Sequence, residues 1–203
     1  MKKVLIGLVA VAFTLGMIGC DEADLISFLY DDSFAGVDGD TSEWSKTGST
    51  VNLGKSWSLL GGKATVKGYS DKPAETLGNL YHRGTRGLGV IGGYNNQIDY
   101  QNKREAITID FDVPHYLNSL ELRSFFDETG GKEKARIEFY LDDSPYPTLI
   151  LTATELYGSG GEGSYIHNFL TPPLVDYVKF DIIGSQNYVH DFSVAKLDVT
   201  SVP

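Results

Sequence analysis

Apolar and polar residues alternate along much of the chain beyond residue 50. Between positions 107 and 112, Ile, Ile and Phe occupy every second place, and Thr and Asp fall between them. Residues 120–123 and 136–139 repeat this alternation. A period of two directs one set of side chains to a buried sheet face and the other set to water. The pattern therefore predicts half-buried β-strands.

Short runs rich in β-branched and aromatic residues continue this pattern, and Gly, Asn, Asp or Pro separates them at intervals of roughly eight to twelve residues. No long helical pattern interrupts them. We therefore predict an all-β fold, an antiparallel two-sheet β-sandwich of about ten strands. The predicted strands are residues 50–53, 57–60, 64–68, 88–91, 106–111, 119–125, 135–141, 148–152, 165–169, 177–183 and 192–199.

Glycine-rich and Asp-Pro segments mark the connections between these strands. Residues 129–132 and 158–163 are predicted loops, and Asp142-Asp143-Ser144-Pro145 is a predicted turn at the end of a strand. Residues 21–40 mix acidic and small residues around an apolar run at 25–30, which fits either a short helix or a first edge strand. We interpret this region as a tether and entry segment.

The first 20 residues have a different pattern, that of an export signal. Lys2 and Lys3 precede an apolar run over residues 4–18, which is shorter than the roughly 20 residues that a membrane-spanning helix needs. The acidic residues that follow are unlike the basic flank that stops transfer. We predict a secretory signal peptide over residues 1–19, an anchor and entry segment over 20–44, and one β-sandwich domain over 45–203.

Met17-Ile18-Gly19-Cys20 resembles the lipobox of bacterial lipoproteins, in which a small residue precedes a cysteine that is acylated after cleavage. Cys20 is the single cysteine of the chain, so it has no disulfide partner within it. The resemblance implies a palmitate-type anchor on Cys20 and an exported protein held at the membrane surface without a membrane-spanning helix. Asp21 suggests retention at an inner membrane.

The charge of the chain narrows the classes of partner. There are 17 Lys and Arg residues against 27 Asp and Glu, and removal of the two lysines at positions 2 and 3 leaves 15 − 27 = −12. Nonspecific affinity for nucleic acid comes mainly from basic side chains that neutralise phosphates. Nucleic acid is therefore excluded as a partner, and a cation fits this surface better.

Several short segments of the predicted sandwich are similar to the jelly-roll region of bacterial PEP-CTERM exported proteins. They are residues 87–90, 97–99, 107–111, 120–122, 178–180 and 191–194, within a resemblance over about residues 45–200. The chain ends at Ser201-Val202-Pro203, where that family has a membrane helix and a basic tail. The resemblance implies a jelly-roll-like sandwich associated with polysaccharide-rich envelopes, with the anchor moved to Cys20.

Carboxylates near the N-terminus form a candidate calcium site. Asp38 and Asp40 lie on a Gly-containing segment and supply the oxygen ligands that Ca²⁺ prefers. In related carbohydrate-binding sandwiches a structural Ca²⁺ often joins the entry segment to the last strand, which implies Asp191 as a third ligand. The open alternative is a solvated acidic turn with no metal.

Tyr94, Asn95, Asn96 and Tyr100 form a candidate ligand-binding loop. Aromatic rings pack on the apolar faces of sugars, and amides form hydrogen bonds with sugar hydroxyls. The alternative is a hairpin turn in which Asn adopts a left-handed backbone conformation.

No motif for catalysis stands out in the sequence. The four histidines lack zinc spacing, and no Gly-x-Ser-x-Gly nucleophile elbow is present. We therefore expect a noncatalytic, membrane-anchored envelope lipoprotein whose sandwich binds or organises extracytoplasmic material such as polysaccharide. The alternatives are a structural or adhesion module that binds another envelope protein, and a glycan-active enzyme.

Overall fold

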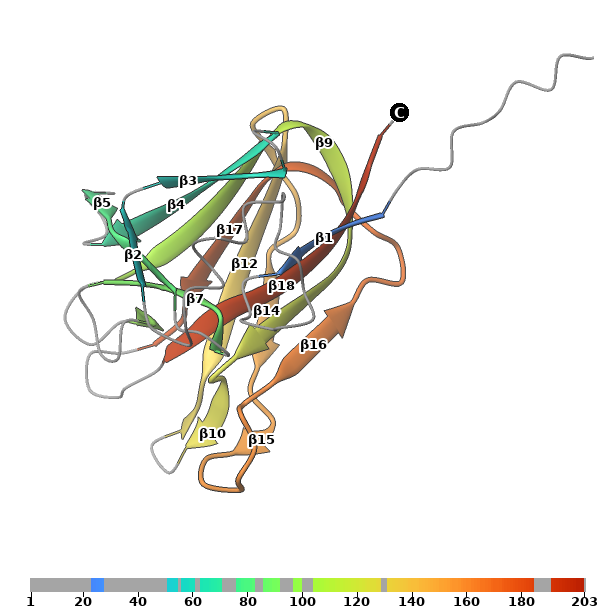
Figure 1. The fold of residues 1–203 in the computed structure, drawn as a ribbon. Helices are drawn as coiled ribbons and strands as arrows, with labels where there is room; N and C mark the ends of the chain where they lie inside the picture. Colours follow the sequence, from blue (N-terminus) through green and yellow to red (C-terminus); the bar gives the residue numbers. More distant parts are fainter. Residues whose placement is uncertain are drawn as a thin grey trace, which may run out of the picture.

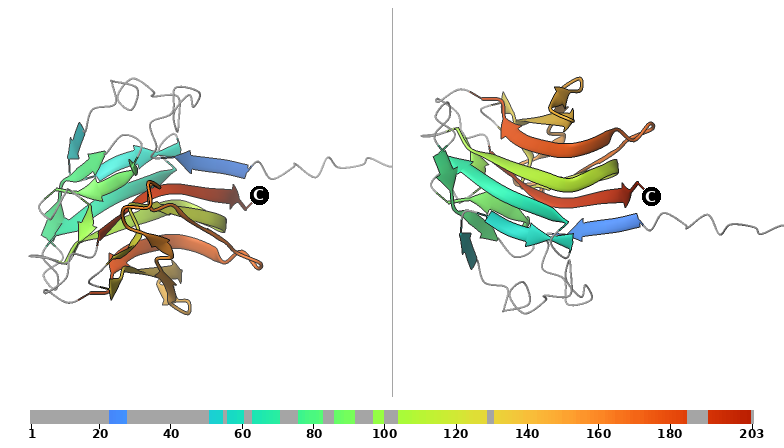
Figure 2. Two further views of the ribbon diagram at one scale, coloured as in Figure 1. Left: turned by 90° about the horizontal axis from the view of Figure 1, so that it is seen from below. Right: turned by 90° about the horizontal axis from the view of Figure 1, so that it is seen from above.

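The computed structural model describes residues 23–27, 51–54, 56–60, 63–70, 76–82, 86–91, 97–99, 104–128, 131–184 and 191–202. Within these ranges the chain forms eighteen β-strands and no α-helix (Figure 1). It follows that none of the described segments is a helix that could cross a membrane. The strands curve around one shared core (Figure 2).

One layer of the sandwich is built on the first half of β9 (Ala106–Arg123), which pairs with β17 on one side and β4 on the other. Next to β17 lies β12, whose outer edge pairs with β13 and β14, and β4 pairs at its outer edge with β3 and β5. The bounds are β3 (Ser56–Leu59), β4 (Ala64–Ser70), β5 (Thr76–Gly78), β12 (Lys134–Leu141), β13 (Ser144–Pro145), β14 (Leu149–Thr152) and β17 (Leu174–Ile182).

The other layer is built on the second half of β9, which pairs with β18 and β16. β18 also pairs with β1, β7 and β8. β7 pairs in turn with β6, and β6 pairs with β2. The bounds are β1 (Ala23–Ser27), β2 (Val51–Gly54), β6 (Leu80–His82), β7 (Leu88–Val90), β8 (Ile98–Asp99), β16 (Tyr165–Asn168) and β18 (Asp191–Ser201).

A small third sheet extends from one end of the sandwich. It consists of β11 (Gly131–Lys132), β10 (Phe126–Glu128) and β15 (Glu155–Leu156). β10 and β15 run parallel, which is an exception to the antiparallel pairing elsewhere. The segment 129–132, predicted as a loop, thus contributes a short strand, because Asp127 and Lys132 face each other in the β10–β11 ladder.

β9 is one arched strand that belongs to both layers, whereas the sequence predicted two strands at 106–111 and 119–125. Asp110 pairs with Tyr177 of β17, and the next β9 residue to pair with β17 is His115, opposite Val175. Pro114, which has no backbone N–H to donate, lies within this unpaired stretch. The intervening residues form the arch at the top of the molecule in Figure 1.

The core forms where the apolar halves of the alternating strands meet. Buried residues come from both layers, among them Ile107 and Ile109 of β9, Phe180 of β17 and Phe192 of β18. Phe125 packs edge-to-face against Phe192, with ring centroids 6.0 Å apart. The predicted all-β, two-sheet sandwich is therefore confirmed.

The described residues of the entry segment, 23–27, form an edge strand, which is one of the two predicted alternatives. β1 pairs antiparallel with β18, and Ala23 lies opposite Thr200. Only Asp21 and Glu22 separate β1 from Cys20 in the sequence. Residues 23–27 of the predicted entry segment therefore belong to the sandwich.

Candidate functional site

The outward-facing side chains of β12, β17 and β9 lie in rows across the sheet. Because apolar residues alternate with polar ones, Ile137, Phe139, Val178 and Phe180 face the core and their neighbours face outward. Each β12 side chain of this outer face lies directly opposite one from β17. The three cross-strand pairs are Arg136–Asp181, Glu138–Lys179 and Tyr140–Tyr177.

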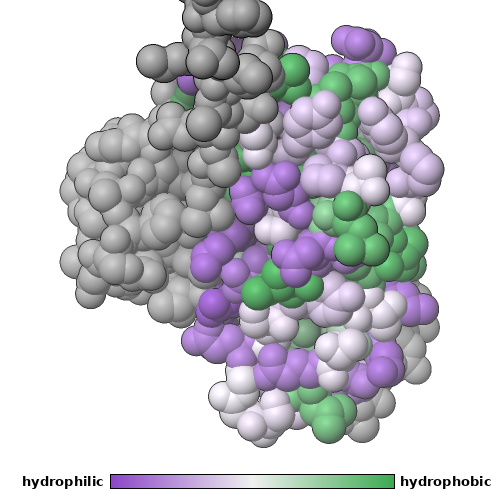
Figure 3. All heavy atoms as spheres, turned by 90° about the vertical axis from the view of Figure 1, so that its right-hand side faces the viewer, coloured by the Kyte–Doolittle hydropathy of each residue, from purple (hydrophilic) through white to green (hydrophobic). Residues whose placement is uncertain are grey.

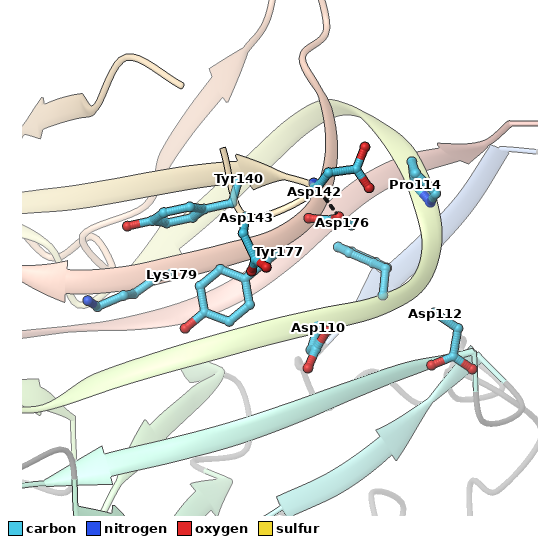
Figure 4. Close-up of a pocket in the computed structure, with 10 residues that line it drawn as sticks. Asp110, Asp112, Pro114, Tyr140, Asp142, Asp143, Asp176, Tyr177 and Lys179 are labelled. Carbon is cyan, nitrogen blue, oxygen red and sulfur yellow. Dashed lines mark hydrogen bonds between the residues drawn. The ribbon is translucent and has the colours of Figure 1, made fainter. Parts of the chain in front are cut away.

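The Tyr140–Tyr177 row, which lies next to the β9 arch, borders a groove of about 570 Å³ (Figure 4). Its floor carries Tyr140 and Tyr177, and its walls carry carboxylates from three elements. We call this feature the tyrosine groove and define it by Tyr140, Tyr177, Asp110, Asp112, Asp142, Asp143, Asp176 and Lys179.

The two tyrosines form an edge-to-face pair. Their ring centroids lie 5.4 Å apart and their planes meet at 78°. This is the arrangement that the quadrupoles of two aromatic rings prefer, so the pair holds each ring in place. Both side chains are half-buried, which leaves aromatic surface accessible in the groove.

An interruption in the pairing of β9 with β17 adds a carboxylate beside Tyr177. Between the pairs Tyr177–Asp110 and Val175–His115, β17 has one residue, Asp176, and β9 has the four residues of its arch. In a regular strand, Asp176 and Tyr177 would point to opposite faces. Here both line the groove, because the pairing is irregular at this point.

A tight turn between β12 and β13 supplies two further carboxylates. Asp142 and Asp143 have φ angles of 49° and 60°, as the central residues of a two-residue type I′ hairpin do. Asp tolerates this left-handed backbone better than most residues because its short side chain accepts local hydrogen bonds. The backbone N–H of Asp142 donates to Oδ2 of Asp176 at 2.7 Å, which ties the turn to β17 (Figure 4).

The tyrosine groove is acidic. Five aspartates line it against one lysine, and Nζ of Lys179 lies 3.0 Å from Oε2 of Glu138. Nζ of Lys67 lies 3.8 Å from Oδ2 of Asp110, at a partly exposed pair. Asp112 and Asp143 are exposed, and neither forms an ion pair with another described residue. The negative charge at the groove is therefore only partly compensated.

A second group of carboxylates is buried where β18 begins, at the opposite end of the strand ladder. Glu133, between β11 and β12, is fully buried, and its Oε1 and Oε2 accept hydrogen bonds from the backbone N–H groups of Asp191 (3.1 Å) and Phe126 (2.6 Å). Gln97 Nε2 donates to Oδ1 of Asp191 at 2.8 Å. Burial, together with repulsion from Asp191, raises the pKa of Glu133 to about 9.

Asp191 is the one predicted site residue that the structure describes. It is buried, pairs with Asp99 across the β18–β8 ladder and accepts a hydrogen bond from Gln97. Within the described ranges no three His, Cys, Asp or Glu side chains are arranged to hold a metal ion. Asp38 and Asp40 lie outside those ranges, so calcium binding stays a prediction.

The remaining predicted site residues also lie outside the described part of the chain. These are Cys20 and the candidate ligand loop with Tyr94, Asn95, Asn96 and Tyr100. The tyrosine groove was not predicted from the sequence, although the turn at Asp142-Asp143 was. The alternation of apolar and polar residues does indicate that Tyr140, Tyr177 and Lys179 face outward. It does not indicate that β12 pairs with β17, which brings these side chains together.

No protein-family model and no curated protein matches the chain. The similar solved structures include carbohydrate-binding modules (CBMs). The family 32 CBM of Clostridium perfringens NanJ, solved in complex with galactose, is 11% identical over 68% of this chain and 93% of the module, with a TM-score of 0.40. CBM32-3 of a family 31 glycoside hydrolase from Clostridium perfringens is 15% identical over 80% and 97%, with a TM-score of 0.34.

The C-terminal domain of a Bacteroides fragilis chitobiase is 14% identical over 69% of this chain and 94% of the domain, with a TM-score of 0.35. All three TM-scores lie below 0.5. These similarities therefore do not locate a ligand site in this chain.

Proposed function

We propose that the protein is a noncatalytic, membrane-anchored lipoprotein whose sandwich binds polysaccharide in the tyrosine groove. The observation that carries the proposal is the ordered pair of Tyr140 and Tyr177 beside carboxylates that converge from β9, β17 and the β12–β13 turn. Sugar rings present apolar C–H faces that pack on aromatic side chains. Their hydroxyls donate hydrogen bonds, which carboxylates accept.

The groove also has the form that a chain-like ligand needs. The exposed side chains of Asp112, Asp142 and Asp143 line it on the outer face of the sheet, so a polymer can lie across it without threading its end into a pocket. The floor is rigid, because Tyr140 and Tyr177 belong to paired central strands and Asp142 is tied to Asp176. A rigid site loses little conformational entropy when the ligand binds.

The alternative, an adhesion module for another envelope protein, finds less support. Ile166 of β16 and the adjoining Leu170 are exposed, at 60% and 103% of their reference area. On the face seen in Figure 3, however, apolar residues form several separate patches with polar residues between them. Stable protein interfaces have a larger contiguous apolar centre.

Replacement of Tyr177 by Ala is expected to weaken polysaccharide binding about tenfold, because an aromatic contact contributes about 0.5–1.5 kcal/mol beyond its buried area. Isothermal titration of the detergent-solubilised chain with a panel of soluble glycans measures this. Tyr157→Ala is the matched control, since Tyr157 is 69% exposed near β15 and contacts Phe126. Equal affinities for the wild type and Tyr177→Ala would contradict the proposed site.

The anchor is tested separately. Cys20→Ala is expected to abolish incorporation of labelled palmitate and to move the protein from the membrane pellet to the soluble fraction, because Cys20 is the only thiol of the chain. Because β1 begins at Ala23, an acylated Cys20 would hold the sandwich close to the bilayer surface. Palmitate incorporation that persists in Cys20→Ala would contradict the lipoprotein assignment.

A further inference from the structure

The tyrosine groove has more carboxylates than a neutral sugar needs as hydrogen-bond acceptors. Asp112, Asp142 and Asp143 are exposed, and only Lys179 among the lining residues is basic. The ammonium of Lys179 is already paired with Glu138, as described above. A ligand with carboxylate or sulfate groups would be repelled, and a neutral ligand would leave the charge uncompensated.

These carboxylates are also spread along the groove and not gathered at one point. Asp110 and Asp112 come from β9, and Asp142 and Asp143 come from the β12–β13 turn (Figure 4). In the part of the chain that the structure describes, no three acidic or histidine side chains meet as metal ligands. The distribution therefore suits positive charges placed at intervals along a polymer better than a single metal ion.

We propose that the tyrosine groove selects glycans with free, protonated amino groups, that is, de-N-acetylated hexosamine polymers. This inference rests on the proposed function, since it concerns the ligand class of the same groove. The tyrosine pair packs on the sugar rings, and the aspartates on both walls form charge-assisted hydrogen bonds with the ammonium groups. Such bonds are stronger than those between two neutral groups, so the free amine determines the preference.

A matched pair of ligands tests this. Glucosamine oligomers and N-acetylglucosamine oligomers of equal length share a backbone and differ in the charge of the 2-amino group. By isothermal titration of the full chain in detergent, the wild type is expected to bind the glucosamine oligomer at least about tenfold more tightly. Added salt should reduce this preference, because the aspartates are exposed.

The charge variant is Asp112→Asn with Asp143→Asn. Both side chains are exposed, and Asn tolerates the positive φ of position 143, so the fold is expected to persist. The control, Asp127→Asn with Glu162→Gln, removes the same number of charges at the β10–β15 end of the molecule, where these residues pair with Lys132 and Arg123. The preference should fall at least about threefold in the groove variant and stay unchanged in the control.

The outcomes separate the inference from the proposed function. Equal or tighter binding of the acetylated oligomer, still weakened by Tyr177→Ala, would overturn the inference and keep the groove as a glycan site. A preference that falls equally in the control variant would also overturn it, because attraction would then come from the net charge of the chain. Binding of both oligomers that is insensitive to Tyr177→Ala, or no binding of either, would overturn both.

Discussion

Replacing Asp181 with Ala is expected to lower the free energy of unfolding by about 3–5 kcal/mol. Asp181 is fully buried, and its carboxylate accepts hydrogen bonds from two arginines. Arg104 binds it in a bidentate manner, through Nε at 3.0 Å and Nη2 at 2.7 Å, and Arg136 binds through Nη2. Loss of the carboxylate leaves two largely buried guanidinium groups without that partner, which costs far more than a lost surface ion pair.

Urea unfolding of the purified chain measures this loss. The control is Asp110→Ala, which breaks the partly exposed pair with Lys67, where the Nζ and Oδ2 atoms lie 3.8 Å apart. Pairs of that kind contribute about 0–1 kcal/mol, so the control should differ little from the wild type. A loss below about 1 kcal/mol for Asp181→Ala would show that Asp181 is not the group that secures β17 to Arg104 and β12.

Glu133 is expected to make the protein less stable as the pH rises. Its ordinary pKa is 4.5, and in the folded chain burial and the neighbouring Asp191 raise it to about 9. Between these values the folded state holds a proton that the unfolded state has released. The free energy of unfolding therefore falls by up to about 1.4 kcal/mol per pH unit across this window. The contribution is fully present below pH 4.5 and is lost above about pH 9.

The substitution Glu133→Gln removes the titrating group and should flatten this slope. A Gln side chain offers one acceptor oxygen where Glu133 accepts from both Phe126 N and Asp191 N, so the variant should lose about 1 kcal/mol at pH 5. Urea unfolding at pH 5, 7 and 9 measures both effects. Glu162→Gln, at an exposed position, is the control and should keep the wild-type slope. Identical pH slopes for Glu133→Gln and the wild type would refute the protonated, buried state of Glu133.

The strands could be predicted from the sequence because their alternation is strong. The segment 135–141 became β12, and the segment 192–199 lies within β18. The arch of β9 was missed because Pro114 and the polar residues around it normally end a strand. Here the strand changes layers at that point, so both of its halves find partners. The short strand β15 was missed because its partner, β10, lies far away in the sequence and pairs with it in parallel register.

The candidate site was harder to predict than the fold. The sequence predicted the turn at Asp142-Asp143 and gave no reason to connect it with Tyr177. The groove exists because β12 and β17 pair in a register that places Tyr140 opposite Tyr177. It also depends on the interrupted pairing of β9 with β17, beside which both Asp176 and Tyr177 line the groove. Register and such irregularities follow from the packing of the whole sheet, and a single strand's sequence does not contain them.

The burial of particular carboxylates could not be predicted from the sequence either. Glu133 follows a Gly-Lys pair and resembles a solvated loop residue. In the structure it joins β10 to the start of β18 through two backbone hydrogen bonds. Asp191 was predicted as a calcium ligand beside the last strand, and it is the first residue of β18. Its carboxylate accepts a hydrogen bond from Gln97, a residue that no ligand pattern singled out.

The most direct test of the central claim is to locate the bound sugar. Amide chemical-shift mapping of the isotope-labelled protein during titration with a glucosamine oligomer does this residue by residue. We predict that the largest shifts cluster at Tyr140, Asp143, Asp176 and Tyr177, around the tyrosine groove. Shifts confined to the loop with Tyr94, Asn95, Asn96 and Tyr100, with the groove residues unchanged, would contradict the proposed site.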